Sequence, residues 1–176
     1  MKLTIFFLVT FICVNGFSSD HKMNHHGMKV EKDNKSRQFL ESGAKEQFLN
    51  VLKINESLHG SFFKYDAKGV EKNAKAMRKA LGEIKDSALL KLLNGTSEYL
   101  GKLTSKETQK SNYHHYNLVS KKLLSVLNSF DLGPIYNAYS CPMVQKVWIQ
   151  NSKKMEKVHN PYASYMPYCG SKDSNY

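Results

Sequence analysis

Apolar side chains recur at intervals of four and three residues along positions 70–88. The series consists of Val70, Ala74, Met77, Leu81, Ile84 and Ala88. Five basic residues lie off the series: Lys72, Lys75, Arg78, Lys79 and Lys85. This spacing draws one apolar stripe along an α-helix and leaves the charges on its other face. Such a helix is stable in water only when its stripe packs against other elements.

Similar apolar intervals indicate three further helices. They cover about residues 39–65 and 86–102, and a region that opens at a capping box, Thr104 to Glu107, and ends before Gly133. No segment before residue 134 shows the two-residue alternation of a strand. Because the connections are short, the sequence predicts an all-α fold, an antiparallel four-helix bundle over residues 38–132.

The chain changes character after this region. Residues 133–170 contain the only Trp of the chain, Trp148, together with Cys141 and Cys169. Their periodicity is too weak for a fifth long helix. We therefore expect an irregular Cys/Met/Trp segment packed on the bundle as part of the same domain, followed by a tail at 171–176.

The N-terminus has the pattern of a signal peptide over residues 1–18. Lys2 precedes an apolar run, Leu3 to Ile12, which is too short to span a bilayer. The bulky Ile12 directly before Cys13 argues against lipoprotein processing at that cysteine. The sequence predicts export to the periplasm and no membrane span after processing, with a disordered His/Met-rich tail at 19–37.

Charge and missing motifs exclude several function classes. The formal net charge is +11, but export and the helical spacing of the lysines favour solvated faces over binding of nucleic acid. The chain lacks a phosphate-binding glycine loop, a His-Glu-x-x-His helix, a CxxC pair and a nucleophile elbow. We therefore predict that the protein is not an enzyme.

Candidate metal ligands gather at both ends of the chain. The N-terminal set is His21, Met23, His25, His26 and Met28, and the C-terminal set is Cys141, Met143, Met166 and Cys169. Thiolates and thioethers select Cu(I) and Ag(I), whereas imidazoles suit Cu(II). The sequence thus predicts a Cu(I)/Ag(I) site at the C-terminal end and a Cu(II) site in the tail. A structural disulfide between Cys141 and Cys169 is an equal alternative, because cysteines pair in oxidising compartments.

The order of motifs in the C-terminal segment resembles a bacterial domain of unknown function. The motifs are Cys141-Pro142-Met143, Trp148, Asn160-Pro161-Tyr162, Met166 and Cys169-Gly170. That domain occurs alone in small exported proteins and as the C-terminal extension of periplasmic adaptor subunits in heavy-metal (copper/silver) efflux pumps. The helical region, about residues 44–132, is also similar to that family's bundle. The resemblance implies a periplasmic setting and a link to heavy-metal handling.

The leading functional prediction is a periplasmic copper- or silver-binding accessory protein. It would buffer the ion or hand it to an efflux system, with an efflux adaptor or another envelope protein as its partner. The alternative is an envelope interaction module that is stapled by the disulfide and binds no metal.

Overall fold

The computed structural model describes residues 37–176. The predicted signal peptide, Cys13 and the tail ligands His21, Met23, His25, His26 and Met28 lie outside these residues. The described part contains the helices α1 (Ser42–Phe63), α2 (Ala67–Gly82), α3 (Ser87–Leu92), α4 (Thr96–Gly101) and α5 (Gln109–Ser129). It also contains the strands β1 (Tyr136–Cys141), β2 (Lys146–Asn151) and β3 (Ser171–Lys172).

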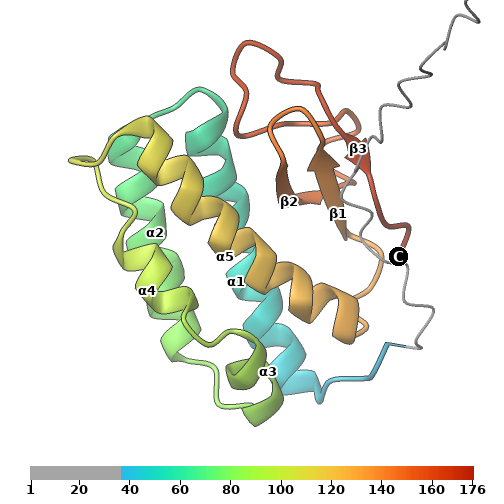
Figure 1. Cartoon of the computed structure of the whole chain (residues 1–176). Helices are drawn as coiled ribbons and strands as arrows, with labels where there is room; N and C mark the ends of the chain where they lie inside the picture. Colours follow the sequence, from blue (N-terminus) through green and yellow to red (C-terminus); the bar gives the residue numbers. More distant parts are fainter. Residues whose placement is uncertain (1–36) are drawn as a thin grey trace, which may run out of the picture.

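The predicted all-α four-helix bundle is therefore wrong, because the chain has a mixed α/β fold. The three strands form an antiparallel sheet in the order β2-β1-β3. Figure 1 shows the helices gathered on one side of the molecule and the sheet, with the C-terminal loops above it, on the other. The segment at 133–170, which was expected to be irregular, supplies β1 and β2, and β3 lies within the expected tail.

Sequence analysis missed β1 and β2 because both faces of these two strands are covered. On one face, Tyr136 and Asn151 contact α1 through Glu56. On the other, Gln150 and Cys141 contact the loop that follows β2. A strand that is buried on both sides carries no alternation of polar and apolar residues. The burial of β2 is accordingly continuous from its second residue to its last.

The predictions for the helical first half of the chain agree better with the structure than those for the C-terminal segment. The predicted apolar stripe is buried from Val70 to Ile84. Helix α2 ends at Gly82, however, and Ala88, the last residue of the predicted stripe, is exposed in α3. The predicted third helix is instead two short helices, α3 and α4, separated by a turn at Asn94 and Gly95.

The predicted capping box of the last long helix is wrong. Helix α5 begins after Thr108, whose side-chain oxygen accepts a hydrogen bond from the backbone N–H of Ser111 at 3.1 Å.

Among residues 37–176, no helix combines the length and the hydropathy that crossing a bilayer requires.

Glu56 joins the helical half of the fold to the sheet. Its carboxylate accepts hydrogen bonds from the Tyr136 hydroxyl (2.6 Å), the Asn151 amide (2.8 Å) and the Lys154 ammonium (2.6 Å). Burial alone would raise the pKa of Glu56, but these three donors outweigh it and lower the pKa from its usual value of 4.5. The carboxylate thus stabilises the fold in its ionised form.

We expect Glu56→Gln to lower the free energy of unfolding by about 1–3 kcal/mol at pH 7, because a charged acceptor that serves three donors is lost. A depressed pKa contributes stability above the unfolded value and loses it as the pH falls through the folded value. The difference in free energy of unfolding between wild type and variant should therefore disappear below about pH 4.5. Urea denaturation at several pH values checks this, with Glu98→Gln, at an exposed position of α4, as the control that should change little. A gap that persists at pH 3 would contradict the role of the charge.

Candidate functional site

Buried side-chain amides organise the loop after β2 in place of regular secondary structure. The Gln150 amide donates to the carbonyls of Met155 (3.0 Å) and Lys157 (2.7 Å), and its oxygen accepts from the backbone N–H of His159 (3.0 Å). One buried side chain therefore fixes the path of residues 155–159. This explains why a polar side chain is buried in the middle of the fold at this position of β2.

The Asn160-Pro161-Tyr162 turn fixes the end of the same loop. The Asn160 side chain, which is fully buried, donates to the carbonyl of Cys169 at 2.9 Å and accepts from the backbone N–H of Tyr162 at 2.9 Å. The backbone N–H of Asn160 donates to the carbonyl of Pro167 at 2.8 Å. The turn thus holds Cys169 beside the end of β1.

The two cysteines lie in contact. Cys141 is the buried last residue of β1 and Cys169 is half-buried, and their Sγ atoms are 2.6 Å apart. The neighbouring Cys141 thiol and, after it, burial raise the pKa of Cys169. Two thiols at this separation need no backbone movement to join as a disulfide.

The two predicted methionine ligands are placed differently. Met143 lies in the turn between β1 and β2 with 68% of its surface exposed. Met166 is half-buried, and its carbonyl accepts from the backbone N–H of Cys169 at 3.0 Å. Of the four predicted C-terminal ligands, the structure therefore brings the cysteines into contact and keeps Met166 in the adjoining turn. Within residues 37–176, no group of three or more His, Cys, Asp or Glu side chains is placed to hold a metal ion.

Large apolar side chains are exposed in the turn that follows Cys141 and in the turn that precedes Cys169. Met143, Tyr165 and Tyr168 are 68%, 76% and 60% exposed, and they belong to the two turns that the cysteines join. We call these three residues the Tyr/Met surface. A Lys157 ammonium lies 6.0 Å from the Tyr168 ring centroid, so positive charge borders this surface.

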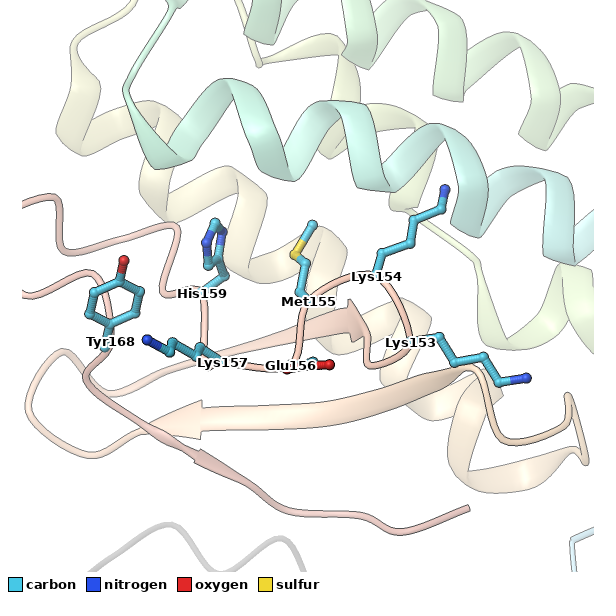
Figure 2. Close-up of a pocket in the computed structure, with 7 residues that line it drawn as sticks. All are labelled: Lys153, Lys154, Met155, Glu156, Lys157, His159 and Tyr168. Atoms are coloured by element: carbon cyan, nitrogen blue, oxygen red, sulfur yellow. The ribbon is translucent and has the colours of Figure 1, made fainter.

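A pocket that sequence analysis missed lies beside the same loop. It has a volume of about 460 Å³, and Figure 2 shows the residues that line it. They are Lys153, Lys154, Met155, Glu156, Lys157, His159 and Tyr168. Three lysines and one glutamate give the pocket a positive character.

His159, which lines this pocket, lies close to a second histidine, His59. The His159 ring stacks on Phe63 of α1, with centroids 3.9 Å apart and planes 6° apart, and its centroid is 6.3 Å from that of His59. Because the two histidines are a hundred positions apart and belong to no motif, sequence analysis did not connect them. One signal was available: His59 lies three residues before Phe62, on the inward face of α1.

The His59 imidazole is fully buried and neutral. Burial, followed by the nearby His159 ring, lowers its pKa from 6.5 to about 3. The backbone of His159 acts in the opposite direction and by itself would raise the pKa of His59. Among the residues that the structure describes, neither imidazole nitrogen has a hydrogen-bond partner.

No protein family, no curated protein and no solved structure matches this chain. The resemblance to the exported domain of heavy-metal efflux systems therefore stays a prediction.

Proposed function

We propose that this chain is an exported interaction module that carries a Cys141–Cys169 disulfide and docks on an envelope protein through the Tyr/Met surface. The observation that carries the proposal is the 2.6 Å contact between the two Sγ atoms. In an oxidising compartment, adjacent thiols form a disulfide. The crosslink would fix the turns that hold Met143, Tyr165 and Tyr168.

The composition of the surface supports docking of a protein. Tyr and Met are enriched in the buried centres of protein interfaces, where their side chains give a large contact area. Three of the five large apolar side chains exposed in residues 37–176 belong to this surface. The lysines beside it, with the net charge of +11, favour an acidic partner.

Two measurements test the proposal. Protein isolated from the periplasm is denatured and alkylated without reductant, and the peptide containing Cys141 should be found linked to that containing Cys169. Alkylation of both cysteines would contradict the disulfide. A photo-crosslinking residue at Tyr165 should then capture an envelope protein, whereas one at Lys79 on the exposed face of α2 should not. Equal capture at both positions would contradict a specific surface.

A second candidate is the copper- or silver-binding accessory protein that supplies an efflux system. The observation that favours it is the same pair of sulfurs, with Met166 one turn away. After reduction, these thiolates and thioethers would offer the ligands that Cu(I) and Ag(I) select. Uptake of Cu(I) only after addition of reductant, weakened in Met143→Leu, is the expected result. Identical binding by wild type and Met143→Leu would remove Met143 from the site. The Cu(II) site of the N-terminal tail also stays a prediction.

A further inference from the structure

His59 is a titratable side chain that is held in the core without a hydrogen bond. It is 1% exposed, and among the residues that the structure describes neither of its ring nitrogens has a partner. A proton added to this ring would create a buried cation with no acceptor beside it, which costs much more than burial of the neutral ring. A charge can therefore form on His59 only when a part of the fold that covers it moves away.

One part that covers His59 is the loop of residues 152–168, which follows β2. The His159 ring of this loop stacks on the His59 ring with centroids 6.3 Å apart, and on Phe63 with centroids 3.9 Å apart. Figure 2 shows the His159 side chain rising from the loop toward α1, the helix that carries both residues. A proton on either imidazole thus places a charge at the contact between the loop and α1.

The charged groups of the loop do not offset such a charge. Three lysines and one glutamate line the pocket beside His159, so the loop itself is positive. The turn before Cys169 contributes Tyr168, whose ring centroid lies 6.3 Å from that of His159. An imidazolium at His159 would therefore add to an existing excess of positive charge.

The neighbouring helices do not offset it either. On α1, Glu56 lies one turn before His59, but its carboxylate is paired with the Lys154 ammonium at 2.6 Å. On α5, the hydroxyl of Tyr116 donates to Asn55, and burial raises the pKa of Tyr116, so this side chain stays neutral. Within residues 37–176, His159 is the only titratable group whose charge shifts the pKa of His59.

We propose that His59 and His159 form a pH-sensitive contact, which holds the loop of residues 152–168 on α1 at neutral pH and releases it in mild acid. The loop carries Tyr165 and Tyr168, two of the three residues of the Tyr/Met surface. Release would therefore withdraw the docking surface in acid, a consequence that rests on the proposed function. The contact itself does not depend on a partner or on the disulfide.

The direction of the pH dependence follows from the two rings. Burial, followed by the His159 ring, lowers the pKa of His59 from 6.5 to about 3, and burial lowers the pKa of His159. A group with a depressed pKa takes up its proton as the structure opens, so the closed loop is fully favoured above pH 6.5 and loses this advantage as the pH falls. For His59 alone, the ratio of open to closed loop should rise about 25-fold between pH 7 and pH 5.

Hydrogen exchange of the full-length protein between pH 7 and pH 5 tests the proposal, with each rate corrected for the intrinsic pH dependence of exchange. Backbone amides of the loop, such as those of His159 and Asn160, should exchange about 25-fold faster at pH 5, whereas those of α2 should not change. This range stays above pH 4.5, the usual pKa of Glu56, so the ion pair with Lys154 remains formed.

Two substitutions remove the titrating ring in different ways. His59→Phe and His59→Leu fill the site with side chains that bind no proton, and loop exchange in both should be independent of pH. The matched control, His114→Phe at an exposed position of α5, should keep the 25-fold acceleration.

Three results would overturn the proposal. The first is a wild-type loop whose corrected exchange is the same at pH 7 and pH 5, and the second is an equal acceleration in α2, which would mean that the whole fold opens. The third is an acceleration that persists in both His59 variants. Each leaves the disulfide mapping and the crosslinking at Tyr165 unaffected, because those measurements do not depend on acid.

Discussion

Replacing Cys141 with serine is expected to lower the free energy of unfolding by about 3–4 kcal/mol in protein kept under oxidising conditions. A disulfide from Cys141 to Cys169 closes a loop of nearly thirty residues, and this restricts the unfolded chain more than the folded one. The loop has little regular structure of its own, as only β2 lies within it. Guanidinium denaturation of the oxidised proteins measures the difference.

Serine at position 141 also places a hydroxyl in a buried site. The effect of losing the crosslink on stability therefore has to be separated from the effect of the changed packing. Adding a reductant should lower the free energy of unfolding of the wild type by a similar amount. The same reductant should leave the free energy of unfolding of Cys141→Ser unchanged. Cys169→Ser, at the half-buried end, provides a second variant with a smaller packing change. Wild type that is indifferent to reductant would show that the two thiols do not stabilise the protein by pairing.

Gly170→Ala is expected to destabilise the protein by about 3 kcal/mol or more. Gly170 has φ of +137°, a conformation that other residues rarely adopt. A Cβ there would lie 2.6 Å from the backbone oxygen of Ser140 and 2.8 Å from a ring carbon of Trp148. Neither atom can yield easily, since Ser140 belongs to β1 and Trp148 is fully buried. The added methyl group would push the chain after Cys169 away from the sheet.

Gly133→Ala is the matched control. Its φ is +82°, but a Cβ at that position would meet nothing within 4 Å. The substitution should therefore cost only the backbone strain of about 1 kcal/mol. Chemical denaturation of the two variants separates strain from steric exclusion. Similar losses in both would mean that the contact between Gly170 and Trp148 is not tight in solution.

The helical half of the fold follows from its sequence because its stabilising pattern is local. The α2 stripe repeats within one helix, and its burial matches the predicted face. The break between α3 and α4 was not foreseen, because a run of leucines at helical intervals masked the turn at Asn94 and Gly95. In both cases, the residues that indicate the helix or hide the break in it lie within a few positions of one another.

The second half of the fold depends on buried polar side chains and on contacts between residues that are distant in the sequence. Gln150 and Asn160 are polar residues that are fully buried because each satisfies several backbone groups of a loop. A pattern based on hydropathy counts them as surface residues, which hides the strand that contains Gln150. The approach of Cys141 to Cys169 could be predicted from compartment and composition. The approach of His59 to His159 could not, since it depends on how a loop packs on a helix a hundred residues earlier.

The Glu56 contacts divide the fold into a part that can form early in folding and a part that can form only late. Asn151 and Lys154, which cover this carboxylate, follow it by 95 and 98 positions. A chain that leaves the ribosome or crosses a membrane amino end first can pair α1 with α2 early, but it cannot cover Glu56 until most of its length has emerged. Contacts over such separations form slowly, because a long loop has to close first. Late closure of this kind would leave the carboxylate of Glu56 without its partners, and the helical half without the sheet, until the last part of the fold forms.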